Sequence, residues 1–176
     1  VSGSGVITGG NPNYECCENH GAVTALNAST GEKLWEYHTM PAAEYTGAVS
    51  STGVKQRGPS GAPIWTTPTI DAKRGQVYVT TGENTSPPTT GTSDSIIALN
   101  LETGEEIWVF QALENDMWNF GCSAGGPNCI ILGDTNSVDF DFGGPAILVE
   151  TDDRELLIAG QKSGDLWALG PVTGAV

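Results

Sequence analysis

The stretch AVTALNASTGEKLWEY, residues 22–37, sets the pattern for the fold. An alternating apolar strand ends in Ala-Leu, a turn closed by Thr-Gly follows, and a second strand carries Trp35. The pattern returns in SIIALNLETGEEIWVF (95–110) and, up to its Thr-Gly, in GDLWALGPVTGAV (164–176). Gly supplies the positive φ that a hairpin turn needs, and the alternation places every second side chain on a buried face. The sequence therefore predicts a repeated β-hairpin.

Two further strand pairs precede the second and third copies. They are IWTTPTIDAKRGQVYVTTGE (64–83) and PAILVETDDRELLIAGQKSG (145–164), with turns at DAKRGQ and TDDR. Each copy thus belongs to a four-stranded antiparallel unit, and repeated units of this kind predict an all-β fold, the blades of a β-propeller. A β-sandwich of unrelated hairpins is the alternative. A Trp repeated at one register favours the propeller, because a large ring there can wedge between neighbouring sheets.

These units predict one incomplete propeller domain of about three blades, and we expect the chain to be part of a longer protein. Long irregular stretches on such a scaffold commonly carry function. The expected bounds are 1–176 for the domain, 1–40 for a blade remnant, 64–110 for a full blade, 145–176 for a partial blade, and 41–63 and 111–144 for the loops.

Composition limits the class of protein. The 176 residues include 24 Gly and 10 Pro and carry a formal net charge of −14. Gly and Pro at this level favour turns and short strands, and the acidic charge argues against nucleic acid or an anionic membrane as a partner. No apolar run approaches the roughly 18 residues of a membrane span. The profile fits a soluble extracytoplasmic protein, periplasmic or secreted, or one that meets a basic partner.

The four cysteines form two local pairs in the sequence. Cys16 and Cys17 are adjacent and can close a strained disulfide ring; two free buried thiols, or cysteines paired elsewhere, are the alternative. Cys122 and Cys129 flank a Gly-Gly-Pro turn that could bring them together. Two local disulfides would suit an oxidising compartment.

The repeated hairpins resemble the tryptophan-docking motifs of the pyrroloquinoline quinone (PQQ)-dependent alcohol dehydrogenases. The segments CCENHGAVTAL, GPSGAPIWTTPTID, DMWN and AGQKSGDLWAL are most similar to the polyvinyl-alcohol dehydrogenase branch of that family. The resemblance covers nearly the whole chain. It implies an eight-bladed propeller with PQQ on the central axis, a calcium ion beside the cofactor, and an oxidoreductase that acts on alcohols.

The resemblance also implies that PQQ is held between two flat groups. Cys16 and Cys17 match a vicinal disulfide that lies against one face of the quinone, and Trp65 matches an indole on the other face. Such stacking contributes roughly 0.5–1.5 kcal/mol beyond burial. A core or inter-blade position is the alternative for Trp65, whereas Trp35 and Trp108 are predicted to be structural.

A loop and a lysine match the groups that contact the cofactor rim in the family. Ser60, Gly61 and Ala62 match a loop that contacts the carboxylates and rim of the quinone; an ordinary turn is the alternative. Lys162 matches the basic residue that contacts the quinone carbonyl oxygens, where a cation polarises the electrophilic carbonyl group. A solvated turn lysine is the alternative for Lys162.

The expected metal ligands depart from the family pattern. Calcium prefers several hard oxygen ligands, but Pro63 stands where methanol dehydrogenases have a carboxylate. Glu83 falls at the position of the amide ligand, with Asn84 next to it, and its carboxylate would partly compensate for the change at 63. Asn119 is a further candidate ligand.

The general base is also displaced. Asn119 stands where the methanol and ethanol enzymes have an Asp, and an amide cannot accept the alcohol proton. We expect Asp116 to be the base and Asn119 to orient substrate or metal; a loop-capping carboxylate is the alternative for Asp116. His20 stands where the family often has an Arg that pairs with a PQQ carboxylate, and its contact should weaken above roughly pH 6.5.

We therefore expect part of a quinoprotein alcohol dehydrogenase that transfers a hydride from an alcohol to PQQ. The substrate would be a secondary alcohol or polyol, small or polymeric, and a cytochrome c or another acceptor would receive the electrons. The remaining blades would lie on a missing segment or on other chains. The changes at Pro63, Asn119 and His20 support a rival interpretation, a non-catalytic propeller scaffold that binds proteins.

Overall fold

The computed structural model describes four segments of the chain. Within them nearly all regular structure is antiparallel β-strand, and the one helix found there, α1 (Phe120–Ser123), is a single turn. The all-β prediction is confirmed. The described residues are 2–4, 18–123, 125–129 and 138–176.

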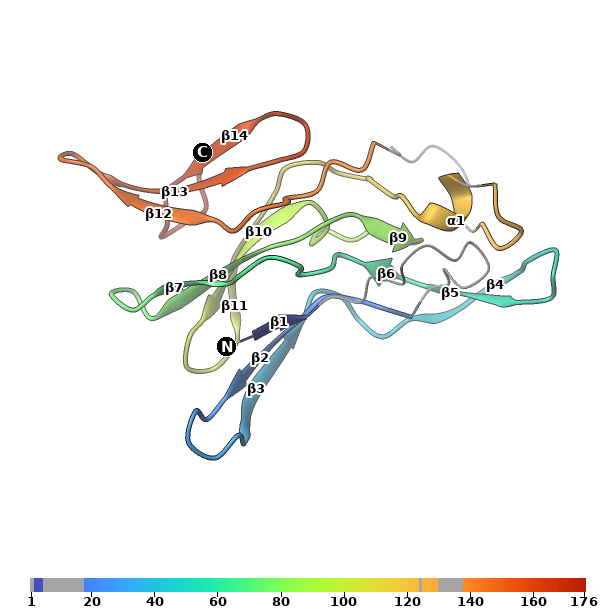
Figure 1. The fold of residues 1–176 in the computed structure, drawn as a ribbon, viewed down its shortest axis with the longest axis horizontal. Helices are drawn as coiled ribbons and strands as arrows, with labels where there is room; N and C mark the ends of the chain where they lie inside the picture. The colour runs from blue at the N-terminus through green and yellow to red at the C-terminus, as the bar shows by residue number, and fades with distance from the viewer. Residues whose placement is uncertain (1, 5–17, 124, 130–137) are drawn as a thin grey trace.

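Three antiparallel sheets form the main body (Figure 1). The middle sheet has four strands in the order β11-β10-β8-β7, as the repeat predicts, and the sheets before and after it have the orders β1-β2-β3 and β12-β13-β14. Their strands are β1 (Ser2–Ser4), β2 (Ala22–Leu26), β3 (Lys33–His38), β7 (Thr69–Asp71), β8 (Gln76–Thr80), β10 (Ser95–Asn100), β11 (Glu106–Gln111), β12 (Ile147–Glu150), β13 (Glu155–Gly160) and β14 (Leu166–Leu169).

The hairpins β2–β3 and β10–β11 turn in the same way. The Asn27 side-chain oxygen accepts the backbone N–H groups two and three positions later, at 2.9 and 3.2 Å, and Asn100 does the same at 2.8 and 3.0 Å. Gly31 (φ 74°) and Gly104 (φ 75°) close these turns in the left-handed region. The predicted positive-φ glycines are confirmed, and their turns set the strand registers.

The hydrophobic core lies between the sheets. Strands β8 and β10 are buried along almost their whole length, so the middle sheet is covered on both faces. Val77, Val79, Ile97 and Leu99 pack with the first sheet on one side. Tyr78, Ile96 and Ala98, at the alternate positions, pack on the other side with Leu157 and Leu169 of the third sheet.

The repeated tryptophans contact the turn of the following sheet. The Trp35 indole N–H donates to the Leu101 carbonyl at 3.1 Å, and its ring lies where a Cβ on Gly104 would stand. Trp108 repeats this contact with the third sheet, donating to the Pro171 carbonyl at 3.3 Å. Each indole therefore fastens one sheet to the next at a glycine that leaves room for the ring.

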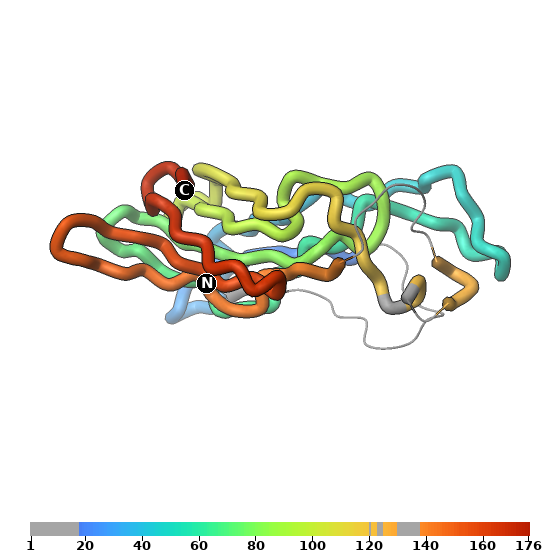
Figure 2. Tube along the Cα trace, turned by 90° about the horizontal axis from the view of Figure 1, so that it is seen from above, coloured from blue at the N-terminus to red at the C-terminus, as the bar shows by residue number. Residues whose placement is uncertain are grey.

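The stretch expected to be irregular at 41–63 contains β4 (Glu44–Val49) paired with β5 (Lys55–Gly58), and β6 (Ser60–Gly61), which pairs with β9 (Asn84–Ser86) from the expected blade over 64–110. Figures 1 and 2 show the β4–β5 hairpin and α1 together at one end of the elongated molecule, away from the hairpin turns of the third sheet. In the described part of the chain, no helix is long and apolar enough to cross a membrane.

Candidate functional site

The candidate site is built on the short β6–β9 pair. The buried Ser60 hydroxyl lies 2.6 Å from that of Ser86 and 2.7 Å from that of Thr85. The Ala62 N–H donates to the Glu83 carbonyl at 2.6 Å. These bonds hold the loop expected to contact the cofactor rim directly against a residue expected to bind metal.

Gly61 allows this close approach. Its φ is 112°, and a Cβ there would stand 2.5 Å from both the Glu83 carbonyl oxygen and the Thr85 nitrogen. Ala62 follows with a φ of 42°, uncommon for a residue with a side chain. Backbone of this kind persists only where its surroundings fix it, as at binding and catalytic sites.

Three carboxylates meet beside this pair. One oxygen from each of Glu83, Asp139 and Asp141 lies within 4.8 Å of the others. Glu83 and Asp141 are buried, whereas Asp139 is partly exposed. Asp141 accepts the backbone N–H of Glu83 at 2.9 Å, and a Cβ on Gly82 would stand 2.8 Å from the same carboxylate oxygen. We call these three residues the carboxylate cluster.

Lys162 joins the carboxylate cluster to an exposed indole. Its Nζ lies 2.8 Å from Asp139 Oδ1 and 2.7 Å from Asp141 Oδ2. The same ammonium lies 5.5 Å from the centre of the Trp65 ring, within cation–π range. Trp65 is 42% exposed, although tryptophan is usually well buried. An aromatic face, a cation and hard oxygen ligands are thus gathered in one place.

The charges in this region perturb one another. Burial, and then the hydrogen-bonded Asp141 carboxylate, raise the pKa of Glu83 well above its usual range. Burial also raises the pKa of Asp139, with Lys162 opposing the shift. Burial alone would lower the pKa of Lys162, but its bonds to Asp139 and Asp141 raise it above the ordinary value. Lys162 therefore stays charged, and the raised pKa of Glu83 reflects the burial and crowding of its carboxyl group beside Asp141.

The two expected amide ligands have structural partners. The Asn84 side-chain oxygen accepts the Thr90 N–H at 3.0 Å, and its amide donates to the Ser60 carbonyl at 3.4 Å. The Asn119 amide donates to the Thr85 carbonyl at 2.9 Å, and its oxygen accepts a backbone N–H of α1 at 2.7 Å. Both residues lie close to the β6–β9 pair, and their metal-binding roles stay predictions.

Asp116 is fully buried. Its two oxygens accept the backbone N–H groups of Val138 (3.2 Å) and Phe140 (3.0 Å). This geometry favours the loop-capping alternative over the role of base, because both oxygens already have donors. These two hydrogen bonds fix the backbone at the residues immediately before and after Asp139.

His20 lies beside the cofactor loop but pairs with another histidine. It forms a parallel β-bridge with Gly61, and its Nε2 lies 2.9 Å from His38 Nδ1. Burial, and then the charge of His38, lower the pKa of His20. A contact with a cofactor carboxylate would then require a more acidic pH than an ordinary histidine does. The expected disulfide at Cys16 and Cys17 lies outside the described residues.

Comparison with known proteins decides the family. Residues 1–133 match the PQQ family model, described as glucose/ethanol/alcohol dehydrogenase, beta-propeller domain. The chain belongs to this family. It is 35% identical over 162 residues to a polyvinylalcohol dehydrogenase of a Pseudomonas species, covering 92% of this chain and 25% of that protein. The polyvinylalcohol dehydrogenase of Sphingopyxis sp. (strain 113P3) is also 35% identical, over 91% of this chain and 25% of its own.

The fold agrees with that of a solved family structure. A quinohemoprotein alcohol dehydrogenase from Pseudomonas putida HK5 matches with a TM-score of 0.60 at 23% identity, covering 96% of this chain and 26% of that one. The β-propeller prediction and the resemblance to the PQQ family are confirmed. The chain spans about a quarter of the length of the relatives it matches.

Three acidic residues of this candidate site were not predicted from the sequence. Asp139 and Asp141 stand two apart in DFD, inside a loop expected to carry function, and that spacing was the available signal. Asp94 is fully buried, with a φ of 48°, and neither carboxylate oxygen has a hydrogen-bond partner among the described residues. Burial, followed by the charges of Asp116, Asp141 and Asp139, raises the pKa of Asp94 to about 8.

The residues present fit both groups that the PQQ family uses. Three clustered carboxylates with one balancing lysine form a hard, electron-rich donor set, which suits a divalent cation such as calcium. The exposed Trp65 face, with an ammonium beside it, suits a flat anionic ring.

Proposed function

We propose that this chain forms part of the active site of a PQQ-dependent alcohol dehydrogenase. The supporting observation is that Trp65 and Lys162 lie together beside the carboxylate cluster in a chain of the PQQ family. Trp65 would bind one face of the quinone, with the sulfur pair of Cys16 and Cys17 on the other. Ser60, Gly61 and Ala62 would line the rim, and His20 would contact a carboxylate at acidic pH.

When bound, PQQ accepts a hydride from the carbon of the alcohol. Lys162 would place a permanent positive charge where a carbonyl oxygen gains negative charge, because its pKa is raised by its bonds to Asp139 and Asp141. Glu83 and Asp141 would hold calcium, whose charge adds to this polarisation. Asn84 and Asn119 would support these ligands.

We propose Asp139 as the acceptor of the hydroxyl proton, in place of Asp116. Asp139 Oδ1 is bonded to Lys162, which leaves Oδ2 for the substrate hydroxyl. Its side chain is partly exposed, whereas Asp116 is fully buried against two backbone N–H groups. A base must be within hydrogen-bond reach of the proton that it removes, and Asp139 meets this condition more readily.

We further propose a secondary alcohol or polyol as substrate, small or polymeric, because two relatives are named polyvinylalcohol dehydrogenase. Electrons would leave to a cytochrome c or another acceptor.

A periplasmic or secreted location is supported by the disulfide between Cys122 and Cys129, since such bonds persist in oxidising compartments.

The blades are proposed to continue beyond this partial domain. Trp35 and Trp108 would act as tryptophan-docking residues, each fastening its blade to the next. The bounds expected from the sequence, a blade remnant to residue 40, a full blade over 64–110 and a partial blade from 145, stay proposals.

Reconstitution tests this function. The full-length protein is stripped of metal, then supplied with PQQ and calcium, and alcohol oxidation is followed with an artificial electron-acceptor dye. We expect saturable PQQ uptake and dye reduction that require both additions, with polyvinyl alcohol oligomers or secondary alcohols as substrates. Absence of PQQ uptake would instead support the non-catalytic scaffold.

A further inference from the structure

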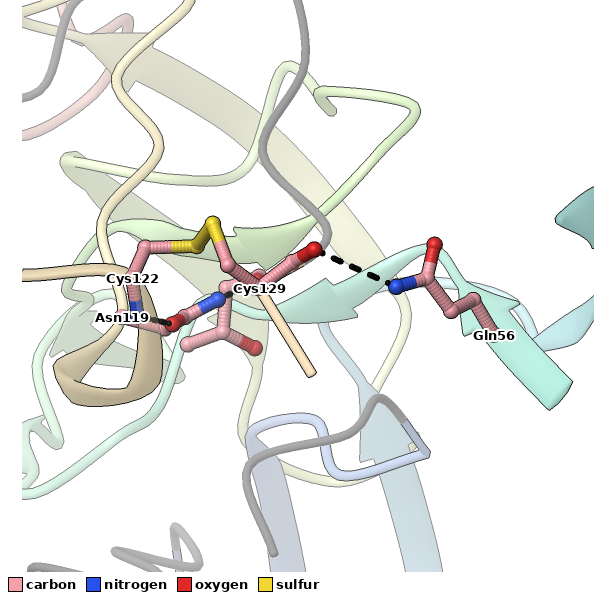
Figure 3. Close-up of a disulfide and its surroundings, with 5 residues drawn as sticks. Gln56, Asn119, Cys122 and Cys129 are labelled. Atoms are coloured by element: carbon pink, nitrogen blue, oxygen red, sulfur yellow. Dashed lines mark hydrogen bonds between the residues drawn. A yellow bond between two sulfur atoms is a disulfide. The ribbon is translucent and has the colours of Figure 1, made fainter. Parts of the chain in front are cut away.

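A loop closed by a disulfide is hydrogen-bonded on one side to Gln56 of β5 and on the other to Asn119 (Figure 3). Cys122 and Cys129 are seven positions apart, with their Cα atoms at 4.5 Å. The loop that they close, here called the disulfide loop, has no role in the function proposed above. Two of its polar contacts are made to the buried side chains of Gln56 and Asn119.

One side of the disulfide loop is bonded to the β4–β5 hairpin. The Gln56 amide donates to the Cys129 carbonyl at 3.2 Å, and the Thr52 hydroxyl donates to the Asn128 side-chain oxygen at 2.6 Å. Gln56 and Asn128 are each only 4% exposed. Gln56 lies on β5, four positions before Ser60, so a bond that fixes β5 also fixes where β6 begins.

The other side is bonded to β9 through Asn119. The Asn119 oxygen accepts the Cys122 N–H at 2.7 Å, and its amide donates to the Thr85 carbonyl at 2.9 Å, in the middle of β9 (Figure 3 shows the bond to Cys122). Asn119 is 4% exposed. A buried amide with both ends bonded is costly to disturb, because each lost partner leaves a desolvated polar group.

We propose that the disulfide loop is a clamp that sets the position of β6 relative to β9, with Gln56 and Asn119 as its positioning residues. The disulfide keeps the Gln56 contact and the Asn119 contact at a fixed separation. Those contacts act on the two strands that carry the cofactor loop and the Glu83–Asn84 ligand segment. The proposal rests on the proposed function for its effect on PQQ, but its effect on the strands does not require a cofactor.

Hydrogen–deuterium exchange of the full-length protein tests the clamp without PQQ. We expect C122S/C129S to speed exchange at the β6–β9 amides by about tenfold or more, as expected when a supporting hydrogen bond is lost. The exchange is measured at two backbone amides. The Ala62 amide donates to the Glu83 backbone carbonyl, and the Asn84 amide donates to the Asp116 backbone carbonyl. Amides of β8 and β10 should keep their wild-type rates, because they belong to the middle sheet.

Two asparagine variants separate positioning from general stability. N119D keeps the oxygen that accepts from Cys122 but loses the donor to Thr85, so exchange at β9 should rise as it does in C122S/C129S. N27D makes the same chemical change in the β2–β3 turn and should leave β6 and β9 unchanged. If PQQ binds the wild type, N119D should weaken PQQ binding by about tenfold and N27D should not.

The outcomes separate this proposal from the proposed function. If wild-type protein takes up no PQQ but C122S/C129S still loosens β6 and β9 alone, the clamp stands and the dehydrogenase assignment fails. Unchanged exchange at β6 and β9 in both C122S/C129S and N119D would overturn the clamp, as would a uniform increase that extends through β8 and β10.

Discussion

Single residues in the candidate site occupy environments that their chemistry disfavours. Trp65 exposes a large indole, and Asp94 buries a carboxyl group without a hydrogen-bond partner among the described residues. Buried polar groups in proteins are normally paired, and tryptophan is normally well buried. Such exceptions often mark sites where a ligand or a reaction completes the environment.

The first prediction concerns Trp65. Trp65→Ala should weaken PQQ binding by about tenfold or more, because it removes both the buried area and the stacking that an indole offers a flat ring. Trp65→Phe keeps an aromatic face and should retain most of the affinity. Titration of PQQ into the metal-loaded full-length protein measures both. Equal affinity in wild type and Trp65→Ala would contradict the stacking role.

The second prediction concerns pH and Asp94. Its pKa is about 8 in the folded protein and about 3.9 when unfolded. Between these pH values the Asp94 carboxyl group is protonated in the folded protein but ionised in the unfolded chain. The free energy of unfolding therefore falls as pH rises from about 4 to 8. Asp94→Asn removes the effect and tolerates the positive φ. It should stabilise the protein at pH 8 by on the order of 5 kcal/mol and change stability near pH 4 little.

Urea denaturation at the two pH values measures this difference. Asp153→Asn, in the exposed β12–β13 turn, makes the same chemical change at the surface and is the matched control. Equal stability of wild type and Asp94→Asn at pH 8 would show that Asp94 is not an unfavourably buried charge.

At the scale of elements, β6 and β9 approach each other so closely that only glycine fits at residue 61. Gly61→Ala should destabilise the protein by on the order of 3 kcal/mol and abolish PQQ binding, because its Cβ would strike backbone atoms at a strained φ. Gly91→Ala, where no atom lies within 4 Å of the added Cβ, is the control and should be close to neutral. Thermal unfolding compares the two; a neutral Gly61→Ala would contradict the packing described.

The sequence allowed some elements to be predicted and not others. The hairpins β2–β3 and β10–β11 were predictable because their apolar alternation and their Asn…Thr-Gly turns are local signals. The β6–β9 pair was not, because β6 has two residues and no alternation. The carboxylate cluster was only partly found, since Asp141 lies 58 positions from Glu83 and meets it through a backbone hydrogen bond that no local pattern specifies.

At the scale of the whole molecule, the sheets depend on contacts that cross between them. Trp35→Ala should lower the free energy of unfolding by about 3–5 kcal/mol, because it leaves a cavity against Gly104. Trp35→Phe keeps most of the packing but loses the hydrogen bond to the Leu101 carbonyl. The loss of this bond alone should lower the free energy of unfolding by about 1 kcal/mol. Chemical denaturation measures both, and a cost below 1 kcal/mol for Trp35→Ala would contradict the inter-sheet role.

The most direct measurement is a crystal structure of the full-length protein grown with PQQ and calcium. We expect the quinone to stack on Trp65 at roughly 3.5 Å, with Lys162 at a carbonyl oxygen and calcium bound by Glu83 and Asp141. A quinone bound elsewhere, or a Trp65 face left bare while the protein oxidises alcohols, would contradict this expectation.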